Sequence, residues 1–350
     1  MQDELIIQLK MKISVAACRP KKNNGMHETG FTVFGIVPKQ ENVLNKAIQI
    51  RLGGYGPETT AFSRSLKFIG DRIEAQFNSR VEIKYVWNIM DLGYRGKDIL
   101  WLVENGILTV GYQSSSYLTD RVPELGFVDL PFLFGTNEQA RFAIDGALGD
   151  YLTAKIEEQM NYRILGYFEN GFRHISNRLR NVYVPGDLKG MKIRVLPSDV
   201  HARTFELLGA VPMQMDLTEA ISGVVNGSVD AQENPFANTV TYGVHKHHHY
   251  HTLSNHFYVS RPIFAHRNSV DAWPEDLRIA MYEATSASVT FQRKLSTQEA
   301  LDSAKAIEGE GGEITQLSAG QQAAFRQAVK PQLEDAYATF GHEVFALVGL

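Results

Sequence analysis

The sequence has a single cysteine in 350 residues, no long apolar run and no excess of basic charge. One cysteine, Cys18, excludes an intrachain disulfide, although scarce cysteine is compatible with an oxidising compartment. No apolar run reaches the roughly 18 to 20 residues that a membrane-spanning helix needs. The net charge of -4 and the pI near 6.3 give no electrostatic reason to expect nucleic acid or an anionic membrane as a partner. The remaining composition, 44% hydrophobic and 21% charged, is that of a soluble chain long enough for two globular domains.

A clear export signal is also missing from the first part of the chain. The stretch LIIQLKMKISVAAC is broken by Gln8, Lys10 and Lys12, whereas a secretory signal needs an uninterrupted apolar run of about 7 to 15 residues. VAAC, ending at Cys18, resembles a lipoprotein cleavage box, but the apolar run before it is short and charged. We therefore expect residues 1–49 to be an N-terminal extension or a degraded targeting segment, with a mis-assigned start as the alternative.

Alternating strand and helix patterns predict an α/β fold. Ile48, Ile50 and Leu52 alternate with polar residues as in a strand, and apolar residues at helical spacing follow from Phe62 to Phe77. Further strands are predicted at residues 81–85, 107–112, 163–168 and 191–196, with a helix over 138–160. This rhythm is typical of a parallel or mixed sheet covered on both faces, where ligands bind beyond the carboxyl ends of the strands.

A long helix is predicted after Pro274, extending to about Ile307 without an internal proline or glycine. About 33 residues of helix would measure roughly 50 Å, which is longer than one small domain. Its apolar stripe is thinned by small residues in the middle. We therefore expect a brace that crosses two domains rather than a coiled-coil arm.

Two arginines and one asparagine are candidates for anion binding. Arg194 lies between Ile193 and Val195 near the end of a predicted buried strand, and a buried charge there costs several kcal/mol unless an anion compensates it. Either an internal salt bridge, to Asp187 or Asp230, or a bound ligand could supply that anion. We expect Arg173 just after a strand, at the edge of the sheet, where an arginine can present two parallel donors to a carboxylate.

The stretch VDAQENP places further polar groups at the end of a predicted strand. Asn234, held by the following proline, could donate its amide to the same carboxylate. Asp230 and Glu233 could be structural partners of the arginines. A simple strand-to-turn junction is the alternative, since Asn before Pro commonly begins a turn.

Several blocks of the sequence resemble one known family. DLKGMKIRV, LGAVPMQMDLTEAISGVVNGSVDAQENP, VPELGFVDLPFLFG and NGFRHISN are similar, in order and spacing, to blocks of the DctP-like solute-binding proteins of tripartite ATP-independent periplasmic (TRAP) transporters. The resemblance extends from about Ile48 to the C-terminus. Because several independent blocks match, it is far more specific than a single short motif.

The resemblance implies a two-domain, type II-like periplasmic-binding-protein clamshell that captures an organic acid in its cleft. It implies one domain of residues 51–170 plus 260–298 and another of residues 171–259 plus 299–350. It also implies that Arg194 forms the main salt bridge to the ligand carboxylate and that Arg173 and Asn234 complete the site. The expected partners are the small and large integral membrane subunits of a TRAP transporter, with the protein periplasmic and a monomer or dimer.

The rest of the expected cleft is aromatic and hydroxylated. It consists of Tyr55, Tyr112, Gln113, Ser114 and Tyr258. Sialic-acid binders of this family carry an acidic residue near the position of Ser114, so that ligand is not expected. The class of organic acid is left open.

A histidine tract, VHKHHHYH, invites a metal interpretation because His247 and His251 are four residues apart. Zinc needs three or four converging ligands, and no further ligand is marked by spacing. We expect an exposed helical face here, and no metal or cofactor. The chain lacks a G-x-S-x-G elbow, so an α/β enzyme is a weaker alternative to a binding protein, and a receptor for a signalling partner is another.

Overall fold

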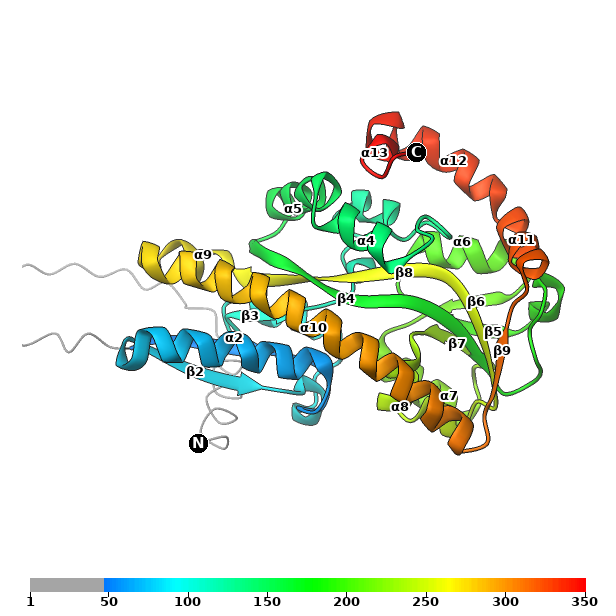
Figure 1. The fold of residues 1–350 in the computed structure, drawn as a ribbon, viewed down its shortest axis with the longest axis horizontal. Coiled ribbons are helices and arrows are strands. Elements are labelled where there is room, and N and C mark those ends of the chain that lie inside the picture. Colours follow the sequence, from blue (N-terminus) through cyan, green and yellow to red (C-terminus); the bar gives the residue numbers. More distant parts are fainter. Residues whose placement is uncertain (1–46) are drawn as a thin grey trace, which may run out of the picture.

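The computed structural model describes residues 47–350, so the predicted N-terminal extension and the box around Cys18 lie outside the described part of the chain. Within it, one nine-stranded mixed sheet has the order β2-β1-β3-β8-β4-β7-β5-β6, with β9 paired to β8 (Figure 1). The predicted α/β architecture is confirmed. The strands are β1 (Ile48–Gly53), β2 (Val81–Val86), β3 (Val110–Tyr112), β4 (Tyr162–Asn177), β5 (Lys192–Val195), β6 (Val211–Gln214), β7 (Ala231–Asn234), β8 (Tyr250–His266) and β9 (Glu313–Gln316).

The two long strands β4 and β8 join the two ends of the molecule. They pair antiparallel along nearly their whole length, while β1 and β2 at one end, and β5 and β6 at the other, are parallel pairs. One hydrophobic core includes Ile50, Phe168 and Phe264, and a second includes Ile175 and Ile193. β4 therefore passes from one core to the other between Phe168 and Ile175.

A bulge marks the place where β4 makes this crossing. The pairing register with β8 shifts between Glu169 and Gly171, and Gly171 has a φ of +87°, which favours glycine. The prediction that the strand ends at Phe168 was wrong, because the glycines mark bulges rather than a stop. As a result Arg173 lies inside β4 and not in a loop after it.

Helices cover the sheet. They are α2 (Ala61–Phe77), α3 (Asp98–Glu104), α4 (Asn137–Ile144), α5 (Ala147–Gln159), α6 (Asp199–Leu207), α7 (Leu217–Asn226), α8 (Phe236–Thr241), α9 (Arg267–Asp271), α10 (Glu275–Gly309), α11 (Ala319–Ala328), α12 (Lys330–Phe340) and α13 (His342–Ala346). The predicted single helix over residues 138–160 is two helices, because the chain breaks at Gly146, which precedes α5 in a non-helical conformation.

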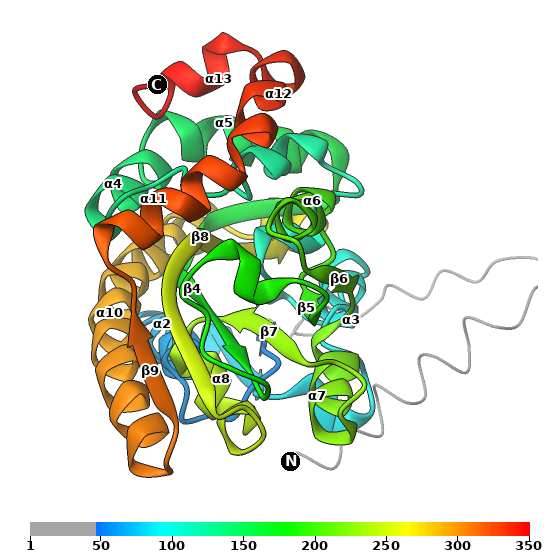
Figure 2. The ribbon, with the colours of Figure 1, turned by 90° about the vertical axis from the view of Figure 1, so that its right-hand side faces the viewer.

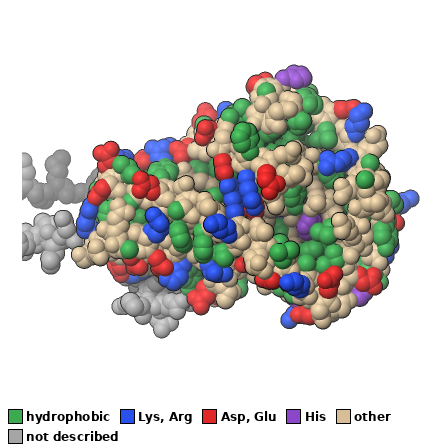
Figure 3. Space-filling model, in the orientation of Figure 1, with side chains coloured by type: hydrophobic (Ala, Val, Ile, Leu, Met, Phe, Trp, Pro, Cys, Tyr) green, Lys and Arg blue, Asp and Glu red, His purple; other side chains and the backbone are tan. Residues whose placement is uncertain are grey.

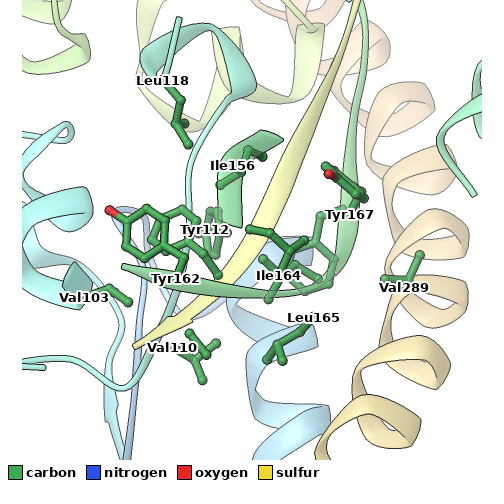
Figure 4. Packing of buried hydrophobic residues seen from close by; sticks show 14 of the residues in the cluster. Val103, Val110, Tyr112, Leu118, Ile156, Tyr162, Ile164, Leu165, Tyr167 and Val289 are labelled. Atoms are coloured by element: carbon green, nitrogen blue, oxygen red, sulfur yellow. The ribbon is translucent and has the colours of Figure 1, made fainter. Parts of the chain in front are cut away.

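Helix α10 is the predicted brace. It has 35 residues and lies against α2 and β4 on one side of the molecule and α8 and β9 on the other (Figure 1). Its Val289 belongs to the first hydrophobic core, close to the side chains of β4 (Figure 4). Small buried residues such as Ala284 and Ser288 let the helix pack closely, and the Ser288 hydroxyl donates to the Ser65 carbonyl of α2.

The C-terminal helices contact both cores. Phe325 of α11 belongs to the second core, whereas Phe345 of α13 packs edge-on against Phe127 in the first. Figure 2 shows α11, α12 and α13 wrapping from the end of the molecule that carries β9 over its upper side. The predicted division into residues 51–170 plus 260–298 and 171–259 plus 299–350 remains a prediction.

The surface carries both signs of charge. On the face shown in Figure 3, acidic and basic side chains are interspersed over the helices, in keeping with the small net charge of -4. No helix within residues 47–350 combines the length and the apolar character that crossing a bilayer would require.

One side chain of α10 fastens the helix to the bulge in β4. The Gln292 amide accepts from the Glu169 backbone N–H at 3.0 Å and donates to the Glu169 carbonyl at 2.8 Å, and all of these groups are buried. Gln292→Ala leaves two buried backbone groups unsatisfied. We predict a loss of about 2–4 kcal/mol in the free energy of unfolding, measured by chemical denaturation. Gln298→Ala, at an exposed position of the same helix, is the control and should change it by less than about 0.5 kcal/mol. Equal effects of the two variants would contradict this role of Gln292.

Candidate functional site

A small cavity lies where several strands end. Asn234 is the last residue of β7, Gln113 follows β3 directly, and Leu196 follows β5, so the cavity lies beyond the carboxyl ends of strands, where a ligand site was predicted. We call it the three-arginine cavity, after Arg173, Arg194 and Arg261. Its full lining is Tyr55, Gln113, Ser114, Tyr117, Arg173, Arg194, Leu196, Leu217, Asn234, Asn238, Tyr242 and Arg261.

Arg194 is buried without an anionic partner. Its side chain is 1% exposed, and its Nε and Nη2 donate to the Met215 carbonyl at 3.2 and 2.9 Å. Nη2 also donates to the Tyr117 hydroxyl at 3.2 Å, which leaves Nη1 without an acceptor in the described part of the chain. A carbonyl and a hydroxyl are neutral, so the guanidinium charge is not compensated by a contact.

Neither carboxylate proposed as an internal partner reaches Arg194. Asp230 forms its ion pair with Arg178, at 2.7 Å, and Asp187 accepts backbone N–H groups of Tyr183 and Val184. Of the two interpretations that the sequence left open for Arg194, the internal salt bridge is therefore wrong for the structure over residues 47–350.

Arg173, in contrast, has an anionic partner within the protein. Its Nε and Nη2 form a fork on the buried Glu233 carboxylate, and Nη2 also donates to the Glu233 carbonyl at 2.6 Å. Burial raises the pKa of Glu233, but Arg173 and the nearby His256 ring, whose Nε2 lies 3.6 Å from the carboxylate, outweigh it and hold that pKa well below its usual range. The expectation that Glu233 serves as a structural partner for an arginine is confirmed.

Asn234 belongs to a chain of side-chain amides. Its carbonyl oxygen accepts from Asn238 at 3.0 Å, and the Asn238 amide also donates to Asn170 at 3.3 Å. Asn170 in turn accepts from Arg261 at 2.8 Å. The chain connects Asn234 at the end of β7 with the bulge of β4, so the orientation of the Asn234 amide is fixed by its neighbours.

Tyr55, Gln113 and Ser114 also line the cavity, as expected. The Gln113 amide donates to the Gly96 carbonyl at 2.9 Å and accepts from the Ser114 N–H at 2.9 Å, so it fixes this loop. Burial raises the pKa of Tyr55 well above its usual value, which keeps the hydroxyl protonated and available as a donor.

Two residues expected in the cleft do not line the cavity. Tyr112 packs in the first hydrophobic core, among the side chains shown in Figure 4, with its ring stacked on Phe62. The Tyr258 hydroxyl donates to the Glu169 carboxylate at 3.0 Å, and its ring contacts Phe134 and Phe172. Both lie on strands next to the cavity, and side chains alternate between the two faces of a strand.

Six lining residues were missed from the sequence: Tyr117, Leu196, Leu217, Asn238, Tyr242 and Arg261. Arg261 stands in the apolar run FYVSRPIF, the same signal that singled out Arg194, and could have been found in that way. Tyr117 and Tyr242 carry no such local signal. Burial raises the pKa of Tyr117 to about 12, against the opposing effect of Arg194, so this hydroxyl stays protonated at neutral pH.

The histidine tract does not form the exposed helical face that was expected. A short 3-10 turn ends at Lys246 and β8 begins at Tyr250, so His247 and His251 do not share a helix. His248 and His251 are fully buried, and burial lowers their pKa values to about 3 and about 4. Over residues 47–350 no three or more His, Cys, Asp or Glu side chains are grouped so as to hold a metal ion.

Comparisons with known proteins identify the family. A sequence model of the DctP family, described as bacterial extracellular solute-binding protein, family 7, matches residues 52–339. The 2,3-diketo-L-gulonate-binding periplasmic protein YiaO of Escherichia coli (strain K12) is 28% identical over 237 residues, covering 67% of this chain and 71% of that protein.

Solved structures show the same fold. The sugar acid binding protein of Advenella mimigardefordensis in complex with galactonate is 27% identical, with a TM-score of 0.82 over 87% of this chain and 97% of that one. A TRAP periplasmic solute binding protein of Sulfurospirillum deleyianum with bound succinate is 25% identical, with a TM-score of 0.80 over 86% of this chain and 98% of that one. The predicted family resemblance and the two-domain clamshell fold are confirmed.

The pairing of Arg173 with Glu233 can be measured by a double-mutant cycle. Arg173→Met leaves a buried carboxylate unpaired and Glu233→Gln leaves a buried guanidinium unpaired, so each should cost about 3–5 kcal/mol of unfolding free energy. The double variant should cost less than the sum of the two by at least about 2 kcal/mol. The surface pair Arg178 and Asp230 is the matched control, and its coupling should stay below about 1 kcal/mol. Additive losses for Arg173 and Glu233 would show that the pair does not compensate itself.

Proposed function

The chain belongs to the DctP family of bacterial extracellular solute-binding proteins, and we propose on this premise that it captures a small organic acid in the three-arginine cavity. Members of this family are substrate receptors and not enzymes, which sets aside the α/β enzyme considered from the sequence.

The observation that carries this proposal is the buried, unpaired charge of Arg194. Leaving a guanidinium uncompensated away from water costs several kcal/mol, and a ligand carboxylate offers the missing anion. Nη1 of Arg194 has both hydrogens available to a ligand in the cavity, because its neighbours Met215 and Tyr117 bind only Nε and Nη2. Arg194 is therefore proposed as the main carboxylate contact.

The other residues have supporting roles in this proposal. Arg173 adds an N–H donor while Glu233 neutralises its charge, and Asn234 adds an amide held by Asn238. Tyr55 and Tyr242 remain protonated, because burial raises the pKa of both, and they supply hydroxyl donors for the oxygens of the acid. Leu196 and Leu217 provide the apolar part of the wall.

Delivery to a transporter completes the proposal. The protein works in the periplasm and passes its ligand to the small and large membrane subunits of a TRAP transporter, as a monomer or dimer. The relatives named above as periplasmic and TRAP binding proteins support this step. Uptake of the acid by membrane vesicles that contain both subunits should require this protein, and uptake without it would exclude this role.

We propose that the cleft closes by bending at the place where the paired strands β4 and β8 pass from one core to the other. The bulge at Gly171 lies at this crossing, and cavity residues come from both sides of it, Tyr55 from one and Arg194 from the other. The proposed halves are residues 51–170 plus 260–298 and residues 171–259 plus 299–350. The radius of gyration from X-ray scattering should fall when the acid binds, and an unchanged value would count against closure.

Substitution of Arg194 tests the proposed site. Arg194→Ala should weaken binding of the preferred acid by about two to four orders of magnitude, since losing one member of a desolvated pair costs about 3–5 kcal/mol. Arg194→Lys should rescue part of the affinity, because lysine keeps the charge but not the planar fork. Asn234→Ala should cost less, about 1 kcal/mol, as expected for one neutral hydrogen bond.

Calorimetry on each folded variant measures these losses, after an organic-acid library has identified the ligand by thermal shift. Arg178→Ala, in a surface ion pair outside the cavity, is the control and should bind like the wild type. If folded Arg194→Ala protein binds the acid within about threefold of wild type, a loss under roughly 0.7 kcal/mol, Arg194 is not the carboxylate contact.

A further inference from the structure

The Tyr117 hydroxyl joins the two proposed halves of the molecule at the wall of the three-arginine cavity. Tyr117 ends a short 3-10 turn that follows β3, in the half made of residues 51–170 plus 260–298. Its oxygen accepts from Arg194 Nη2 at 3.2 Å and from the Leu217 backbone N–H at 3.1 Å. Both donors belong to the other half, Arg194 to β5 and Leu217 to the first turn of α7.

These two hydrogen bonds determine what the Tyr117 hydroxyl can still bind. A hydroxyl oxygen that accepts twice keeps only its own proton to donate. No protein group within residues 47–350 accepts that proton, and the Tyr117 side chain lines the cavity. The proton is retained at neutral pH, because burial raises the pKa of Tyr117 to about 12. The hydroxyl is therefore available as a donor to an oxygen of a ligand next to Arg194.

A second set of contacts crosses between the halves at the first turn of α7. Asp216 Oδ2 accepts the Lys97 backbone N–H at 3.0 Å, while Asp216 Oδ1 accepts the Thr218 N–H at 3.0 Å and so caps the helix. The Thr218 hydroxyl accepts the Gly96 N–H at 3.3 Å. The loop that precedes α3 is thus bound to the start of α7 by two hydrogen bonds.

The packing of α7 agrees with these contacts. Leu217 lines the cavity and packs in the first hydrophobic core, whereas Val224, farther along the helix, belongs to a separate small cluster. The approach is close at Gly96, where an added Cβ would lie 3.4 Å from Asp216 Oδ2 and 3.5 Å from Leu217 Cβ. Only the first turn of α7 therefore reaches the opposite half of the molecule.

We propose that Tyr117 and Asp216 form a latch that holds the cavity shut over its ligand and sets the rate of ligand release. This inference rests on the proposed function and on the proposed closure, and it adds the residues that control release. The latch hydrogen bonds exist only where β5 and α7 lie against the opposite half, so they act after the ligand has entered. Tyr117 couples the latch to the ligand, because the hydroxyl that accepts from Arg194 and Leu217 donates to the bound acid.

The rates of association and release test the role of Tyr117. Stopped-flow fluorescence measures both for the acid that the wild type binds most tightly in the organic-acid library, which includes succinate and galactonate. Tyr117→Phe keeps the ring and removes the hydroxyl, so release should become about 10- to 100-fold faster while association changes by less than about twofold. Tyr167→Phe removes a hydroxyl that is bonded to Thr153, away from the cavity, and should leave both rates unchanged.

Asp216→Asn tests the latch without changing the wall of the cavity. Asparagine keeps one acceptor oxygen to cap α7, but its second position is an NH₂ group that cannot accept the Lys97 N–H. Release should become about three- to tenfold faster with association unchanged, the effect of one lost hydrogen bond. Circular dichroism checks that each variant is folded.

Hydrogen exchange of two backbone amides follows the latch without a ligand. Tyr117→Phe should speed exchange of the Leu217 N–H, and Asp216→Asn that of the Lys97 N–H, each by at least about tenfold in NMR measurements. Tyr167→Phe should change neither. Unchanged exchange of both amides in the latch variants would overturn the proposal.

The outcomes separate the latch from the proposed function. If Tyr117→Phe slows association as much as it speeds release, Tyr117 only positions Arg194 and there is no latch. If both variants release the acid within twofold of the wild-type rate, the latch is wrong while carboxylate capture stands. If Arg194→Ala keeps wild-type affinity, or no acid of the library binds the wild type, the proposed function falls and the exchange rates alone decide the latch.

Discussion

The structure depends on how three arginine side chains are kept out of water. Burying a guanidinium costs free energy unless an anion lies next to it, and the chain places these arginines in two different kinds of environment. Arg173 is paired internally with Glu233, on the neighbouring strand, whereas Arg194 and Arg261 are held by neutral groups and rings. The ion pair of Arg173 stabilises the fold without a ligand. The positive charges of Arg194 and Arg261 remain for a bound acid to neutralise.

The sheet and the long helix put these arginines in one place. β4 and β8 run through both cores, and the bulge between Glu169 and Gly171 lies where the strand pair passes from one core to the other. Arg173 and Arg261 come from these two strands, and Asn170 in the bulge accepts the hydrogen bond from Arg261. Gln292 of α10 binds the backbone of Glu169, so the brace and the cavity share one short segment of β4.

Much of this architecture could be predicted from local patterns in the sequence. Alternating apolar residues marked the strands around Ile50 and Ile193, and the absence of proline and glycine marked α10. The family blocks pointed to Arg194, Arg173 and Asn234, and the structure brings all of them to one cavity.

What could not be predicted depends on contacts between distant segments. The bulges that carry β4 past Phe168 and the burial of His251 arise where β4 pairs with β8, and the buried His248 contacts Ser176 of β4. Whether Tyr112 points to the cavity or to the core depends on which face of β3 is covered, and nothing adjacent in sequence decides that. Arg261 is a different case, because an arginine inside an apolar run can be recognised in the sequence as a candidate buried charge.

A crystal structure of the protein with its tightest-binding acid tests the central claim most directly. The account predicts a carboxylate within hydrogen-bond distance of Arg194 Nη1 and of the Asn234 amide, while the Arg173 and Glu233 pair stays intact. An acid bound outside the three-arginine cavity, or one inside it that makes no contact with Arg194, would contradict the claim that the ligand compensates this buried charge.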